Sequence, residues 1–93
     1  MILNFRGRVA EAVWAGTIGK GFPADLVRVA QRKLAMLNAA VTLDALRVPP
    51  ANRLEALKGD RAGQHSIRVN DQFRICFVWR DGNAVDVEIT DYH

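Results

Sequence analysis

The second half of the chain is predicted to form three strands joined by two tight turns, and this pattern restricts the fold more than any other feature. Apolar and polar residues alternate in "HSIRVN" (65–70), "FRICFVW" (73–79) and "AVDVEIT" (84–90), as expected for strands with one buried face. Asn70-Asp71 and Asp81-Gly82 are turn-forming pairs, and Asp-Gly strongly favours a two-residue hairpin. The sequence therefore predicts an antiparallel meander.

A period of two places the side chains of these strands on two faces of the sheet. The apolar face is expected to cover helices, and it comprises Ile67, Val69, Phe73, Ile75, Phe77, Trp79, Val85, Val87 and Ile89. The other face is mixed and partly charged, and it comprises Ser66, Arg68, Asn70, Arg74, Cys76, Val78, Asp86, Glu88, Thr90 and Tyr92. This second face is predicted to be open and is the natural place for a ligand.

The first half of the chain is predicted to supply two helices. Residues 7–15 carry apolar pairs four positions apart, and Gly16 is a suitable end for that helix. Pro23 suits the first position of a second helix that ends near residues 38–40. The apolar stripe of this second helix consists of Leu26, Ala30, Leu34 and Leu37.

The remaining segments are predicted to be extended chain and loop. "MILNF" indicates a short first strand, Pro49-Pro50 favours extended chain, and residues 51–64 indicate a short extended piece followed by a loop. Together the elements predict a single α+β domain over residues 1–93, with an N-terminal strand and two helices packed on a mainly antiparallel sheet.

Several classes of protein are not expected from this sequence. No apolar run approaches the roughly 20 residues of a membrane span, and the first residues do not resemble a signal peptide. A single cysteine, Cys76, fits the reduced cytoplasm. One Cys and two His without metal-ligand spacing predict no metal site. We therefore expect a cytoplasmic protein with no membrane partner.

Positive charge is concentrated in the middle of the chain. Residues 47–80 hold seven Lys and Arg against three Asp and Glu, in a chain of net charge +3. The planar arginine fork suits phosphate, and a basic block favours a polyanionic partner. Arg61 and Arg68 are thus candidates for binding RNA, although a solvated basic surface fits the charge equally well.

The polar face also offers the groups that RNA cleavage requires. Attack by the RNA's own 2′-hydroxyl needs a base, a cation to offset phosphorane charge, and an acid for the leaving 5′-oxygen, with no metal or cofactor. Glu55, Asp91 and His93 are candidates for proton transfer. Lys58 and Arg74 are candidates for offsetting the charge.

Each of these residues also has a structural alternative. Tyr92 is a candidate for stacking on a displaced base, but it also suits an end cap of the core. The strand arginines suit cross-strand ion pairs with acids of the last strand. Lys58 and His93 suit ordinary solvated positions.

The segment "RLEALKGDRAGQHSIRVNDQFRICF", followed by "VEITDYH", resembles the HigB group of bacterial toxins in the RelE/ParE superfamily. This resemblance implies a RelE-like fold with a curved sheet, and an mRNA endonuclease that acts in the A site of the 70S ribosome. It also implies inhibition by a helix-turn-helix, HigA-like antitoxin, through which alone operator DNA would be read. The implied functional positions are Lys58, Arg74, Asp91, Tyr92 and His93.

The sequence departs from the family pattern at three positions. Glu55 stands where some members have histidine, His65 where an aromatic residue is usual, and Phe73 where tryptophan is frequent. The first departure leaves the identity of the general base open. Glu55 is a candidate for that role, and His93 then suits the general acid, since nearby carboxylates favour a protonated imidazole.

Two other functions remain open at this point. One is a ParE-like inhibitor of DNA gyrase that binds protein and has no nuclease residues; the terminal "DYH" together with Lys58 and Arg74 argues against it. The other is a weakly active toxin that serves mainly as an antitoxin-binding corepressor. Codon preference and stoichiometry with the antitoxin do not follow from the sequence.

Overall fold

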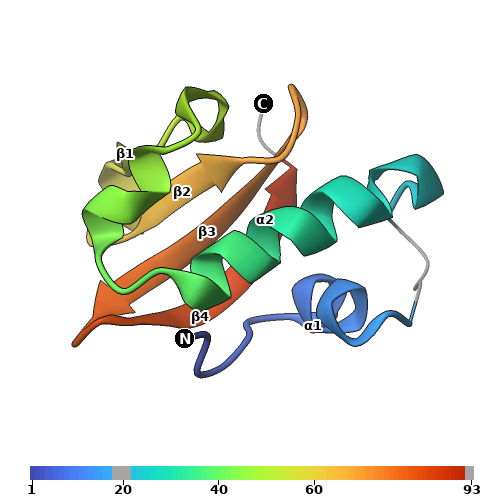
Figure 1. The fold of residues 1–93 in the computed structure, drawn as a ribbon, viewed down its shortest axis with the longest axis horizontal. Helices are drawn as coiled ribbons and strands as arrows, with labels where there is room; N and C mark the ends of the chain where they lie inside the picture. The colour runs from blue at the N-terminus through green and yellow to red at the C-terminus, as the bar shows by residue number, and fades with distance from the viewer. Residues whose placement is uncertain (18–21, 92–93) are drawn as a thin grey trace.

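A computed structural model describes residues 1–17 and 22–91, and within them the chain forms an α+β fold (Figure 1). The sheet is antiparallel with strand order β1-β2-β3-β4. Its strands are β1 (Glu55–Ala56), β2 (His65–Arg68), β3 (Phe73–Arg80) and β4 (Asn83–Asp91). The helices are α1 (Arg8–Ala15) and α2 (Val27–Ala39). Short 3-10 turns are η1 (Ala24–Leu26), η2 (Leu43–Arg47), η3 (Pro50–Asn52) and η4 (Gly59–Arg61).

Both predicted helices are present, with one change at the start of the second. α1 ends at Gly16, whose φ of 79° lies in the left-handed region that glycine tolerates. Pro23 precedes η1 and does not begin α2, which starts at Val27. The predicted stripe faces the sheet, because Ala30, Leu34 and Leu37 are fully buried in the core beneath β3 and β4.

The predicted meander is confirmed, and the extended piece before it becomes a fourth strand. Asp81 and Gly82 have φ values of 52° and 79°, as a primed hairpin turn between β3 and β4 requires. The prediction of extended chain at Pro49-Pro50 holds only for the first proline. Pro50 begins η3, because a proline is favourable in the first position of a helical turn.

A β-bulge in β4 overturns the predicted placement of Val85. The register passes from Cys76–Glu88 to Val78–Val85, so two residues of β4 face one of β3. Asp86 adopts a φ of 54° at this point, and its amide donates to Asn4 Oδ1 at 3.0 Å. The extra residue moves Val85 away from the core and leaves Ala84 fully buried there instead.

The predicted N-terminal strand lies along β4 in parallel, as isolated bridges and not as a continuous ladder. Ile2 bridges to Ala84, and Phe5 bridges to Val87. The amides of Leu3 and Arg6 donate to the carbonyls of β4 at 2.9 Å each. This segment therefore forms an irregular parallel edge of an otherwise antiparallel sheet.

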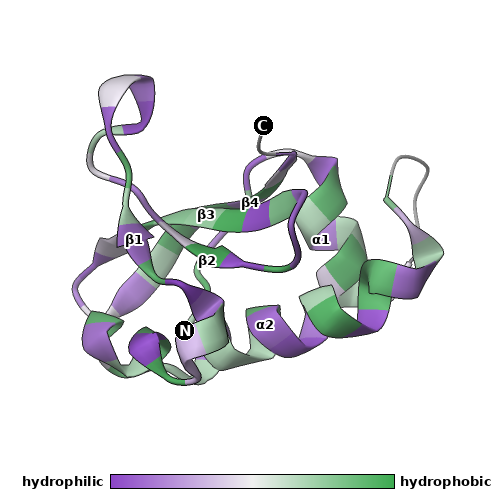
Figure 2. Ribbon diagram, turned by 90° about the horizontal axis from the view of Figure 1, so that it is seen from above, coloured by the Kyte–Doolittle hydropathy of each residue, from purple (hydrophilic) through white to green (hydrophobic). Residues whose placement is uncertain are grey.

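The face of the sheet opposite the helices, here called the outer face, is not open as predicted. The segment from Leu57 to Gln64, here called the 57–64 loop, rises from β1 on the side of the sheet opposite α2 (Figure 2). Arg61 in this loop reaches Glu88 on β4 at 2.6 Å. Ser66 and Cys76 on the outer face are both 0% exposed, so part of this face is a second buried layer.

Candidate functional site

Arg74 is the most firmly held charged residue of the outer face. Its Nε donates to Ser66 Oγ at 2.7 Å, and its Nη2 donates to the carbonyl of Arg53 at 2.7 Å. Only 11% of its side chain is exposed. These bonds fix the plane of the guanidinium, so a phosphate arriving there would meet a preorganised cation.

Glu55 supplies a carboxylate directly beside this guanidinium. It lies on β1, opposite Ser66 on β2, and its Oε1 is 3.6 Å from Arg74 Nη2. The Glu55 side chain is 49% exposed, in contrast with that of Arg74. A solvent-accessible carboxylate next to a fixed cation suits proton transfer close to a phosphate group.

Lys58 lies at the start of the 57–64 loop. It is exposed and immediately precedes η4. The loop is closed at its base by a hydrogen bond from the Leu57 amide to the Gln64 carbonyl at 2.9 Å. The chain therefore leaves β1, places Lys58 at the beginning of the loop, and returns to β2 within a few residues.

Arg61 and Glu88 form the contact between this loop and the sheet. Arg61 Nη1 donates to Glu88 Oε1 at 2.6 Å and to Gln64 Oε1 at 3.1 Å. Cys76 is buried on the same face. Burial raises the pKa of its thiol, and Arg61, Glu88 and Arg74 all lie close enough to influence it. This thiol is therefore a poor nucleophile, and it lies within electrostatic range of all three charged groups.

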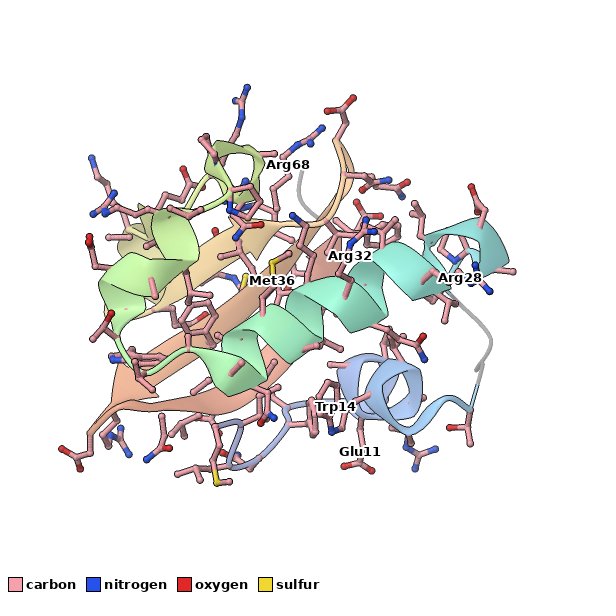
Figure 3. The ribbon with its side chains drawn as sticks, viewed as in Figure 1. Glu11, Trp14, Arg28, Arg32, Met36 and Arg68 are labelled. Carbon is pink, nitrogen blue, oxygen red and sulfur yellow. The ribbon has the colours of Figure 1, made fainter. Side chains whose placement is uncertain are left out.

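Arg68 lies opposite Arg74 in the β2–β3 register but has a different partner. It pairs with Asp71 in the turn that follows β2. It also lies near α2, where the pKa of Lys33 is lowered by burial first, then by Arg32 and then by Arg68. Arg32 belongs to α2 and Arg68 to the end of β2 (Figure 3). The strand arginines were expected to form ion pairs with acids of β4, and this expectation is wrong. Arg68 pairs with Asp71 and Arg74 pairs with Glu55.

Asp91 does not join this group. It pairs with Phe73 across β3 and β4, and therefore lies on the helix side of the sheet, whereas Arg74 lies on the outer face. Its Oδ2 accepts a hydrogen bond from Gln72 Nε2 at 3.0 Å. It lines a cavity of about 540 Å³ together with Val9, Phe22, Pro23, Gln72, Phe73 and Ile89. Tyr92 and His93 lie outside the described residues.

The structure thus brings together part of the predicted site. Arg74, Glu55 and Arg61 share the outer face, and Lys58 begins the loop above it. Sequence reasoning missed the support given by Ser66, Glu88 and the carbonyl of Arg53. The alternation placed Ser66 and Glu88 on the correct face, but no local signal indicates that a loop covers that face.

His65 occupies a structural position on the other side of the sheet. It pairs with Phe77 across β2 and β3, and the two rings stack with centroids 6.3 Å apart. The His65 imidazole therefore packs against the core.

Among residues 1–17 and 22–91, no three or more His, Cys, Asp or Glu side chains are grouped so as to hold a metal ion. None of the helices in this part of the chain has the length and apolar character needed to cross a membrane.

Comparison with known proteins identifies a consistent set of relatives. Residues 11–93 match the family model described as RelE-like toxin of type II toxin-antitoxin system HigB. The chain is 45% identical over 64 residues to Toxin HigB-1 of Vibrio cholerae, covering 69% of this chain and 67% of that protein. It is 30% identical over 93 residues to Endoribonuclease HigB of Proteus vulgaris, covering all of both. An uncharacterised Haemophilus influenzae protein is 39% identical over 71 residues, which are 76% of this chain and 69% of that protein.

Proposed function

Because the chain belongs to the RelE-like HigB toxins of type II toxin–antitoxin systems, we propose that it is a ribosome-dependent endoribonuclease that cleaves mRNA in the ribosomal A site and so inhibits translation. One relative is named an endoribonuclease, and the outer face supplies suitable groups. The observation that carries the proposal is the fixed Arg74 guanidinium with the Glu55 carboxylate 3.6 Å away.

The proposed reaction is attack of an RNA 2′-hydroxyl on the adjacent phosphorus. Glu55 accepts the hydroxyl proton, and Arg74 with Lys58 offsets the charge that develops on the phosphorane. His93 donates a proton to the departing 5′-oxygen. The nucleophile belongs to the substrate, so this mechanism requires no metal or cofactor.

The remaining predicted residues have supporting parts in this proposal. Tyr92 stacks on a displaced base. Asp91, which immediately precedes Tyr92 in the sequence, favours the protonated imidazole of His93. Arg61 and Arg68 attract the RNA backbone, since each is partly exposed at 32% of its side chain.

The proposed site has few proton-transfer groups, and in this proposal the ribosome compensates by orienting the RNA. Fixing the RNA against Arg74 and Glu55 converts an unfavourable encounter into an oriented one, which is worth several orders of magnitude in rate. We therefore expect cuts in translated messages and none in the same RNA free in solution.

Membership of a type II family implies an antitoxin partner. We propose that this antitoxin is a HigA-like helix-turn-helix protein that inhibits the toxin in the cytoplasm and alone contacts operator DNA. In this proposal residues 1–93 act as a single toxin domain.

The experiment is in-vitro translation followed by primer extension on the message. Wild-type protein should produce discrete cuts, and His93→Ala and Glu55→Gln should reduce them at least tenfold. Arg80→Ala is the matched control, because Arg80 is exposed at the hairpin between β3 and β4. Inhibition of gyrase supercoiling with uncut message would support the ParE-like alternative. Antitoxin-dependent operator binding without any cleavage would support the corepressor alternative.

A further inference from the structure

We propose that Glu88 is a positioning residue, which holds the 57–64 loop over the outer face through Arg61 and thereby fixes the backbone that carries Lys58. This inference rests on the proposed function, in which Lys58 offsets charge on the phosphate. Glu88 itself is not required to touch the RNA.

The first observation is that the loop has one side-chain anchor between its two ends. Of residues 58–63, all of which the structure describes, only Arg61 is not exposed. Gly59 and Gly63 have φ values of 64° and 94°, a region that other residues rarely adopt. Leu57 is buried at the start of the loop, but residues 58–63 contribute no buried apolar side chain that would hold them in place.

The second observation is that two strands separate the loop that carries Arg61 from the strand that carries Glu88. The loop leaves β1 and returns to β2, whereas Glu88 lies on β4, beyond β3 in the strand order. The two charged groups meet at 2.6 Å with 32% and 20% of their side chains exposed. The ion pair thus crosses two strands, and it lies on the side of the buried Cys76 thiol.

The third observation connects the anchor to Lys58. The Arg61 amide donates to the Lys58 carbonyl at 3.3 Å, which closes the η4 turn. The Gln64 amide donates to the Arg61 carbonyl at 3.0 Å and ties the same turn to the base of the loop. Fixing the Arg61 side chain therefore fixes the backbone that carries Lys58.

The experiment compares Glu88→Gln with wild type in ribosome-dependent cleavage. The substitution keeps the size of the side chain and removes its charge, and we expect cleavage to fall about 10- to 100-fold, as displacements near 1 Å can cause. Asp81→Asn is the matched control, because it removes one acidic charge from an exposed turn where asparagine tolerates positive φ.

Two further variants test whether Glu88 acts through the loop. In a Lys58→Ala background, Glu88→Gln should cause little additional loss, because both changes remove the same contribution. The exchanged pair Arg61→Glu with Glu88→Arg should recover part of the cleavage lost in either single variant. Fully multiplicative losses and no recovery would overturn the proposal.

Hydrogen exchange separates this inference from the proposed function. Amides 58–64 should exchange at least tenfold faster in Glu88→Gln, while those of β3 remain protected as in wild type. Unchanged protection of the loop would overturn the inference even if the wild type cleaves RNA. A wild-type protein that fails to cleave mRNA, with a loop that loosens as expected, would refute the nuclease assignment and leave the anchor established.

Discussion

Replacing Arg74 by alanine should damage both the stability and the activity of the domain. The substitution removes the hydrogen bonds from the guanidinium to Ser66 Oγ and to the Arg53 carbonyl. Ser66 is 0% exposed, so its hydroxyl would lose this partner in a buried site. Such a loss costs roughly 1–3 kcal/mol, and about 4–8 °C of melting temperature per kcal/mol in a domain of this size.

The same change should reduce cleavage by a further, separable factor. Removing one group that stabilises developing charge costs about 2.7–4 kcal/mol in activation free energy, or roughly 100- to 1,000-fold in rate. Arg74→Lys keeps the charge but cannot make the planar set of hydrogen bonds, so it should show smaller losses in both respects.

The assay combines thermal melts with cleavage of translated mRNA at a temperature where every variant remains folded. Arg80→Ala, which removes one exposed positive charge, should match wild type in both measurements. Wild-type melting of Arg74→Ala would refute the argument from the buried hydrogen bonds. Wild-type cleavage would refute its part in the reaction.

Three further outcomes are expected from other parts of the structure. Lys58→Ala should reduce cleavage about 100-fold and shift the free energy of unfolding by no more than about 0.5 kcal/mol, because the residue is exposed; thermal melts and primer extension measure both. Since burial raises the pKa of the Cys76 thiol, an aromatic disulfide reagent at pH 8 should react far more slowly with folded than with urea-unfolded protein. The lowered pKa of Lys33 means that the unfolded chain binds more protons than the folded one between the folded pKa and the ordinary 10.5. Its contribution to unfolding free energy should therefore rise with pH through that interval, and urea titrations of Lys33→Met should lack this rise.

The elements of the fold followed from local patterns in the sequence, but their irregularities did not. Alternation and the Asp81-Gly82 turn predicted β3 and β4 because both signals lie within a few residues. The bulge at Asp86 depends on Asn4, whose side chain bonds the freed amide from the other end of the chain. No residue near Asp86 in the sequence indicates that contact. The prediction that Val85 lies on the core side of the sheet is therefore wrong.

The candidate site was also predictable only in part. The alternation placed Arg74 on the face opposite the helices, and the register confirms it. The ion-pair partners were not predictable, because Glu55 and Arg61 reach the outer face from segments whose course depends on loop geometry. Asp91 follows Thr90 directly, and the pleat therefore turns the two to opposite faces. Proximity in the sequence to the predicted catalytic residues Tyr92 and His93 was thus a poor guide to the direction of the Asp91 side chain.

The parallel edge formed by the N-terminal segment constrains when the domain can be completed during its synthesis. Asn4 and Asp86 are 82 positions apart, and chains grow at about 5–20 residues per second. The segment that contains Asn4 is therefore synthesised roughly 4–16 s before the part of β4 that it contacts. α1 packs against β4, so it too cannot complete its packing until β4 has been synthesised. Until β4 has left the ribosome that makes it, the parallel edge cannot form and the strand that carries Glu88 is missing, so the outer face is assembled only after β4 has been synthesised.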